Sequence, residues 1–262
     1  MSRPVLSRHI LSRHVLSGMD GDVLRVTLAR PEKKNALTAD MYEAFIAAIV
    51  HAEKEAIGAL LIEGSGGVFT AGNDIGDFLA HSDDFQNAPA LRFIRALAVC
   101  DTPIVAAIEG DAIGVGTTML LHCDLVYAAP SARFRMPFVD LGLVPEAAAS
   151  LLFPQRIGLA KASEFLLLGD SFDAETAARL GIVNALVPAH ELAATALRQA
   201  QRLAEKPRAA LRATRRLLRG DRADVLARIE AEAAAFAKAL RSEEARKAMT
   251  AFMTRTKSGR PD

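Results

Sequence analysis

Short β-rich runs alternate with helical stretches along residues 1–188 of the chain. Apolar and β-branched runs predict strands at residues 24–28, 59–63, 104–109, 125–129 and 133–136. Helical periodicity predicts helices at residues 39–55, 90–99 and 117–123. Strands that alternate with helices are typical of a parallel sheet covered by its crossover helices. The sequence therefore predicts an α/β fold for this part of the chain.

The C-terminal part has a different pattern. Strand signals end near Glu191, and an Ala-, Arg- and Glu-rich sequence follows that predicts three or four helices, one of them beginning after Pro207. One apolar stripe recurs at helical spacing and comprises Val225, Ile229, Ala233, Phe236 and Leu240. Because residues 191–262 show no core of their own, we expect this stripe to face a partner subunit.

The balance of charge excludes one class of partner. The 262 residues include 32 Lys and Arg against 31 Asp and Glu, a formal net charge of +1, whereas proteins that grip nucleic acid carry a basic excess. Four arginines share one predicted helical face: Arg208, Arg212, Arg215 and Arg219. Since no aromatic side chains lie between them, we interpret this face as solvated and expect no nucleic-acid partner.

The apolar runs and the cysteines indicate in which cellular compartment the protein is expected. No apolar run reaches the ~18 residues that a membrane helix needs, so we expect no membrane partner; the longest runs are interrupted by Glu109, Asp111, His122 and Asp124. Cys100 and Cys123 lie in apolar surroundings, which predicts buried, reduced thiols and a cytoplasmic protein.

The N-terminal segment allows two interpretations. The residues before Asp20 are rich in Ser, Arg and His and lack acids, which is typical of an organelle-targeting segment. Their apolar residues also partly alternate, and a Gly-containing turn at residues 18–21 leads into a second alternating run. We favour a first β-hairpin over a processed segment.

Three segments carry the candidate chemistry: residues 64–75 and 109–116, which are rich in glycine, and residues 137–146. The first segment lacks the Gly-Lys-Ser/Thr ending of a phosphate-binding P-loop, and Met119 stands where a dinucleotide fingerprint needs its third glycine. The chain has no Gly-x-Ser-x-Gly elbow and no zinc-type spacing of His and Cys. These absences argue against the commonest ATPases, dehydrogenases, serine hydrolases and metalloenzymes.

Together with residues 30–37, 102–108 and 180–184, the three segments resemble the enoyl-CoA hydratase/isomerase (crotonase) superfamily, and most closely its Δ3,Δ2-enoyl-CoA isomerase-like members. The resemblance extends over almost the whole chain. It implies an α/β fold, a crotonase-type spiral of ββα units followed by a C-terminal helical trimerisation region. Residues 1–190 would form the acyl-CoA-binding core, and residues 191–262 would build a homotrimer or hexamer.

The resemblance also implies an oxyanion hole for a thioester carbonyl. Its two donors would be the backbone N–H groups of Asn73, which follows Gly72, and Val115, which follows Gly114. Such a pair stabilises the charge that develops on the oxygen when a proton leaves the neighbouring carbon.

The acid–base residues depart from the hydratase pattern. The two glutamates of the hydratases fall on Thr118 and Phe138, neither of which is a carboxylate, whereas Glu146 resembles the single catalytic glutamate of the isomerases. One carboxylate suffices to move a proton from C2 to C4, and an apolar wall including Phe138 would raise its pKa. A helix N-terminal acid is the alternative interpretation of Glu146.

The expected substrate is a coenzyme A thioester, with no separate cofactor and no metal. By the resemblance, the CoA would be bound by residues of two loops and of a neighbouring subunit's C-terminal helix: Lys33, Ala36, Leu37, Ala71, Asp74, Ile75, Phe252 and Lys257. The leading hypothesis is an enzyme that shifts the double bond of a 3-enoyl-CoA to the 2-position. The alternatives are an enoyl-CoA hydratase and a non-catalytic acyl-CoA-binding protein.

Overall fold

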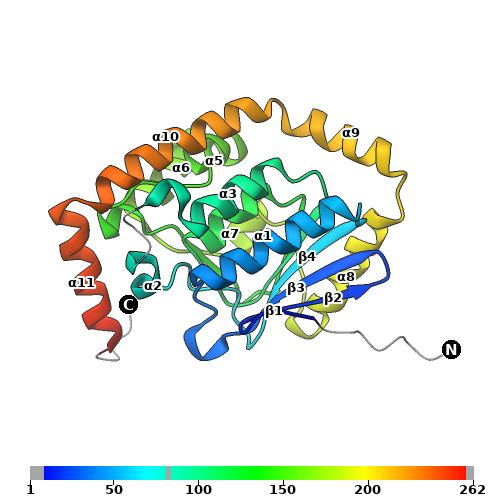
Figure 1. The fold of residues 1–262 in the computed structure, drawn as a ribbon, viewed down its shortest axis with the longest axis horizontal. Helices are drawn as coiled ribbons and strands as arrows, with labels where there is room; N and C mark the ends of the chain where they lie inside the picture. The colour runs from blue at the N-terminus through cyan, green and yellow to red at the C-terminus, as the bar shows by residue number, and fades with distance from the viewer. Residues whose placement is uncertain (1–8, 81–83, 258–262) are drawn as a thin grey trace.

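A computed structural model describes residues 9–80 and 84–257 (Figure 1). Its main sheet has seven strands in the order β1-β2-β3-β4-β5-β7-β10. The first three strands are antiparallel neighbours, and from β3 to β10 each neighbouring pair is parallel. The strands are β1 (His9–Ser12), β2 (Val15–Asp20), β3 (Val23–Leu28), β4 (Ala59–Gly64), β5 (Ile104–Ile108), β7 (Leu125–Ala128) and β10 (Ala185–Leu186).

A second, three-stranded sheet has the order β6-β8-β9. Its strands are β6 (Asp111–Ile113), β8 (Arg133–Arg135) and β9 (Phe172–Asp173). The sequence predicted β8 but neither of the other two. Both are only two or three residues long, too short to show an alternating pattern.

Helices cover both faces of the main sheet. The helices are α1 (Ala39–Lys54), α2 (Ile75–Ala80), α3 (Pro89–Val99), α4 (Val115–Thr118), α5 (Ala149–Ile157), α6 (Leu159–Leu168), α7 (Ala174–Arg179), α8 (Ala189–Ala204), α9 (Arg208–Arg219), α10 (Arg222–Leu240) and α11 (Glu243–Lys257). Leu60 and Ile62 of β4 pack in one core with α1 and α3, while Ala59 and Leu61 pack in a second core with α8. The central strand is therefore buried on both faces, as parallel strands usually are.

The predicted strands and long helices agree with the structure to within a few residues. The helix predicted at residues 117–123 is an exception, because the structure has the short helix α4 followed by a 3-10 turn over Met119–His122. The N-terminal hairpin is confirmed for the part from His9 on, since β2 pairs with both β1 and β3. Residues 1–8 lie outside the described residues.

The apolar stripe of α10 is buried within its own chain, so the prediction that it faces a partner subunit is wrong. Ile229, Ala233 and Phe236 are each at most 3% exposed. The Phe236 ring stacks on Phe85 with centroids 5.0 Å apart and meets the edge of Phe78. α10 thus completes the main core over α3, and Figure 1 shows α9 and α10 arching across the molecule.

The basic face of α9 is solvated only in part: Arg208 is exposed, whereas Arg215 is buried and Arg219 is partly buried, which corrects the prediction for these two residues. The Arg215 side chain is 5% exposed, and its Nε donates to both carboxylate oxygens of Asp124 at 2.8 Å. Arg219 donates to the same carboxylate at 3.0 Å and to the carbonyl of His122. These arginines neutralise a partly buried acid and attach α9 to the start of β7.

Both cysteines are free and buried, as predicted. Burial raises the pKa of each thiol, Cys100 and Cys123, to about 12. Among the described residues, no helix is long and apolar enough to cross a membrane.

Candidate active site

Two glycine-containing loops pack against each other beside the sheets. The Thr70 N–H donates to the Asp111 carbonyl at 2.9 Å, and the Ile113 N–H donates to the Thr70 carbonyl at 3.0 Å. The Thr117 hydroxyl donates to the Ala112 carbonyl. The first two bonds join the loop after β4 to β6, and the third holds the start of α4 against β6. Together they bring the segments that hold Asn73 and Val115 close to each other.

Gly72 permits the close approach of these loops. Its φ is +83°, and a Cβ at this position would lie 2.7 Å from the carbonyl oxygen of Ile113. Gly114 has φ +56° and ψ −119°, a backbone conformation open mainly to glycine. Both glycines therefore set the direction of the peptide that follows them.

The N–H groups of Asn73 and Val115 follow these two glycines. Within the described part of the chain, neither group donates a hydrogen bond to a protein acceptor. Val115 is the first residue of α4, where an N–H has no partner within the helix. The two amides that the sequence singled out thus stand on adjoining loops with their donors available.

The candidate CoA-binding residues also lie on adjoining loops. Leu37 N–H donates to the Gly72 carbonyl, Asp74 N–H donates to the Leu37 carbonyl at 2.9 Å, and Ala71 N–H donates to the Lys34 carbonyl. Arg30 ties the loops together by donating to the Ala36 carbonyl and to Asp74 at 2.8 Å. Burial would raise the pKa of Asp74, but hydrogen bonds from Arg30 and from backbone N–H groups lower it overall.

The remaining candidates are more scattered. Lys33 is exposed at the end of a 3-10 turn, Ile75 begins α2, and Phe138 is buried in the main core. Phe252 is partly buried on α11, the helix that ends at Lys257. α11 packs on its own chain, since a Cβ at Gly142 would lie 2.8 Å from the Ala245 nitrogen. The described residues thus place α11 beside the segment that leads from Phe138 to Glu146.

Glu146 is a partly buried carboxyl that accepts a hydrogen bond from the Thr118 hydroxyl. Burial raises the pKa of Glu146 to about 8, the Thr118 hydroxyl opposes the rise, and the negative charge of Glu232 adds to it. Thr118 is the last residue of α4, the helix that begins with Val115. The structure therefore joins the predicted base to the helix of one predicted oxyanion donor.

Sequence reasoning missed Tyr42 on α1. Its hydroxyl donates to the side-chain oxygen of Asn73. Burial raises the pKa of Tyr42 well above its ordinary value, and the negative charges of Glu146 and Asp77 contribute. A small hollow beside it is lined by Leu37, Ala39, Tyr42, Asp77, Phe78, Ala88, Pro89 and Ala90. Tyr42 lies in a predicted amphipathic helix, where a tyrosine at a core position carries no signal of a site.

Sequence reasoning also missed Glu232 on α10, which binds the turn directly after Glu146. No spacing pattern links a helix residue to a turn more than eighty residues earlier. Within the described residues, no group of three or more His, Cys, Asp or Glu side chains is arranged to hold a metal ion.

Comparison with known proteins places the chain among relatives of one kind. The family described as Enoyl-CoA hydratase/isomerase matches residues 18–259. Enoyl-CoA delta isomerase 2 of Rattus norvegicus is 32% identical over 243 residues, which are 90% of this chain and 62% of the rat protein, so the chain spans less than two thirds of that relative. A probable enoyl-CoA hydratase of Rhodobacter capsulatus is 34% identical over 73% of this chain and 75% of its own length.

A solved structure has the same fold. The crystal structure of an enoyl-CoA hydratase/isomerase from Pseudoalteromonas atlantica superposes with a TM-score of 0.88 at 39% identity, covering 93% of this chain and 98% of that one. Its agreement with the α/β architecture described above confirms the predicted fold class. The chain therefore belongs to the enoyl-CoA hydratase/isomerase family of enzymes, the crotonase superfamily.

Proposed function

We propose that this protein is an isomerase that moves the double bond of a 3-enoyl-CoA to the 2-position, with Glu146 as its acid–base group. The observation that carries the proposal is the environment of the Glu146 carboxyl. It is held by the Thr118 hydroxyl, and burial raises its pKa to about 8. A carboxylate of that pKa is basic enough to remove a proton next to a thioester, and near neutral pH it returns the proton readily.

The proposed reaction needs one base and one anion site. The Glu146 carboxylate removes a proton from C2, which leaves a dienolate whose negative charge lies on the thioester oxygen. The Asn73 and Val115 N–H groups donate to that oxygen and stabilise the charge. The Glu146 carboxyl then delivers its proton to C4, so the double bond ends between C2 and C3 and the carboxylate is regenerated.

Hydration is the second candidate, favoured by the name of the Rhodobacter capsulatus relative. Water addition in the two-glutamate manner needs a second carboxylate to orient the water. The two positions at which the hydratase glutamates are expected hold Thr118 and Phe138 instead, of which Thr118 is fully buried and Phe138 is 6% exposed. A hydroxyl that already donates to Glu146 and a buried phenyl ring argue against that chemistry.

For substrate binding, we propose that the CoA lies along the loops that carry Ala36, Leu37, Ala71, Asp74 and Ile75. The Arg30–Asp74 ion pair supports this by fixing the two loops relative to each other. The exposed ammonium group of Lys33 is available to a CoA phosphate. Phe252 and Lys257 would contribute from the C-terminal helix of a neighbouring subunit. The reaction needs no cofactor besides the CoA thioester itself.

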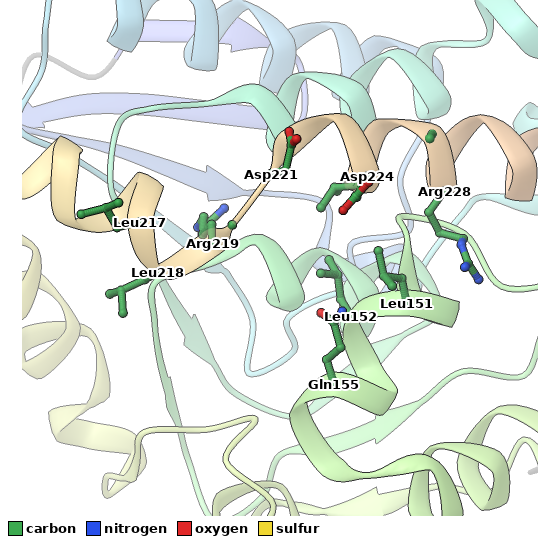
Figure 2. A pocket seen from close by; sticks show the side chains of 12 residues that line it. Leu151, Leu152, Gln155, Leu217, Leu218, Arg219, Asp221, Asp224 and Arg228 are labelled. Carbon is green, nitrogen blue, oxygen red and sulfur yellow. The ribbon is translucent and has the colours of Figure 1, made fainter.

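We also propose self-association as a homotrimer or hexamer through residues 191–262, with residues 1–190 as the acyl-CoA-binding core. Leu217 and Leu218 on α9 are 84% and 83% exposed. They border a groove of about 580 Å³ between α9, α10 and α5, into which Leu151 and Leu152 also face (Figure 2). Two adjacent leucines this exposed support an interface between copies of the chain. The buried free thiols of Cys100 and Cys123 support a cytoplasmic location.

Assays with two substrates test the proposed function. The purified protein is given trans-3-enoyl-CoA and, separately, trans-2-enoyl-CoA, and the products are separated by chromatography. We expect conversion of the 3-enoyl to the 2-enoyl thioester and little 3-hydroxyacyl-CoA. Efficient formation of 3-hydroxyacyl-CoA would favour the hydratase, and binding without turnover of either substrate would favour a non-catalytic acyl-CoA-binding protein.

A further inference from the structure

Glu232 is a buried carboxylate on α10, far in the sequence from the other candidate site residues. It is 6% exposed. One carboxylate oxygen accepts from the Ala148 N–H at 2.6 Å, and the other accepts from the Ser150 N–H at 2.8 Å and the Ser150 hydroxyl at 2.5 Å. Three donors on two oxygens is the pattern of an ionised carboxylate, which accepts only; burial raises the pKa of Glu232, and these hydrogen bonds oppose the rise.

The segment that Glu232 binds is a strained turn directly after Glu146. Ala147 and Ala148 both have positive φ, +61° and +55°, a left-handed region in which the Cβ of alanine is crowded by the backbone. Two consecutive alanines in this conformation persist only when the surroundings hold them. Here the His122 Nε2 donates to the Ala147 carbonyl at 2.8 Å, and Glu232 accepts from the N–H groups of Ala148 and Ser150.

The charged and titratable groups around Glu146 come from several elements. Glu232 raises the pKa of Glu146 by its negative charge. Tyr42 on α1 is a further neighbour, and after burial the negative charges of Glu146 and of Asp77 on α2 contribute to the raised pKa of Tyr42. Burial lowers the pKa of His122 to about 4, so this ring is neutral near pH 7. Arg228, one turn before Glu232 on α10, donates to the Ser150 hydroxyl at 3.2 Å and is the cation nearest to the turn in these contacts.

We propose that Glu232 is a positioning residue for the Glu146 base, since it fixes the left-handed turn that aims the Glu146 carboxyl and places a negative charge beside it. The inference rests on the proposed function in so far as Glu146 is the base. The helical C-terminal region then takes part in catalysis through its own chain, apart from any role in self-association.

The test compares Glu232→Gln with Glu230→Gln in the full-length protein. Glutamine keeps the size of Glu232 but removes the charge. Its side-chain NH2 is a donor and would face one of the backbone N–H groups from which the carboxylate accepts a hydrogen bond. Glu230 lies two residues earlier on the same helix, where it pairs with Arg95 at the surface at 2.8 Å, so its substitution removes a charge without touching the turn.

Two readouts separate positioning from folding. The first is the titration of the Glu146 carboxyl by carbon NMR, assigned by the signal missing from Glu146→Gln. The second is the pH dependence of kcat and KM with trans-3-enoyl-CoA. We expect the Glu146 titration and the acid limb of the rate profile to move to lower pH in Glu232→Gln, with kcat lowered about 10- to 100-fold because the base is misaligned and KM changed less than about twofold. Glu230→Gln should behave as the wild type.

Glu232→Asp restores the charge, so its Glu146 titration should return toward that of the wild type although its shorter side chain lowers kcat. A Glu232→Gln protein with wild-type titration and kcat, altered only in melting temperature, would overturn the proposal. If Glu232→Gln does not fold, Glu232→Asp decides, because a wild-type kcat in that variant contradicts positioning. A wild type that does not isomerise 3-enoyl-CoA refutes the proposed function alone, since the NMR titration still reports on Glu232.

Discussion

The Thr118 hydroxyl donates a hydrogen bond to the Glu146 carboxyl. This bond spans 28 residues of sequence and connects α4, whose first N–H is a proposed oxyanion donor, with the proposed base. The base and one of the two proposed oxyanion donors are thereby fixed to the same short helix. A proton shuttle needs such a fixed relationship, because the carboxyl has to reach C2 while the thioester oxygen lies against the two amides.

Replacing Thr118 by valine should move the activity profile to higher pH. The Thr118 hydroxyl stabilises the ionised form of Glu146 and so lowers its pKa. Without it, the carboxyl should release its proton at a higher pH, and the acid limb of kcat/KM should shift upward. Thr117→Val is the matched control, because the Thr117 hydroxyl donates to the Ala112 carbonyl rather than to Glu146. An acid limb that stays in place in Thr118→Val contradicts the proposed role of this bond.

Glu146→Gln should stabilise the protein more at alkaline than at acidic pH. Folding raises the pKa of this carboxyl from its ordinary 4.5 to about 8. As pH rises between these values, the unfolded chain has lost the proton and the native protein has kept it, so the free energy of unfolding of the wild type falls. Glutamine does not titrate, so the variant does not lose this part of the free energy of unfolding, which is on the order of a few kcal/mol above pH 8. Melting temperatures at pH 5, 7 and 9 check this; a difference from wild type that is the same at each pH contradicts it.

Gly72→Ala should disable the anion site. The added Cβ would lie 2.7 Å from the Ile113 carbonyl oxygen at a residue with φ +83°, so the two loops must separate. We expect kcat to fall about 100-fold or more, the size of effect seen on removing one oxyanion donor. Gly181→Ala is the matched control, because its φ is +74° but no atom lies within 4 Å of the added Cβ. Equal losses of kcat in both variants would point to general strain instead.

Leu218→Asp should weaken self-association. A charge at this exposed position on α9 disfavours burial against another copy of the chain. Because Leu218 is 83% exposed in the single chain, its replacement should not unfold the protein. Sedimentation should report trimers or hexamers for the wild type and smaller species for the variant. Leu159→Asp on α6, at a residue 72% exposed, controls for the added charge. A monomeric wild type refutes the proposed assembly.

Much of the fold could be predicted from local patterns. The runs that became β4 and β5 are almost continuously apolar because these strands are buried on both faces, and such runs are visible without knowledge of their neighbours. The motif around Glu146 was equally visible, since it is contiguous. Residue spacing alone could not give its environment, which depends on Thr118 and Glu232.

The failed predictions concern residues whose partners are distant in sequence. Arg215 carries the pattern of a solvated face, but it pairs with the partly buried carboxylate of Asp124, 91 residues earlier in the sequence, and is itself buried by that contact. Phe236 carries the pattern of an interface residue, but its ring packs against the rings of Phe78 and Phe85 within the same chain. A helical periodicity shows that a face is apolar or basic and leaves open what lies against it.

The most direct test is the turnover of trans-3-enoyl-CoA by Glu146→Gln, measured beside its affinity for the same thioester. Glutamine preserves the shape of the side chain and removes the base. With Glu146 as the single proton carrier, kcat should fall by about 1,000-fold or more, while the dissociation constant of the CoA thioester stays within about threefold of that of the wild type. Retention of more than a tenth of wild-type kcat by Glu146→Gln would contradict the assignment of Glu146 as the base.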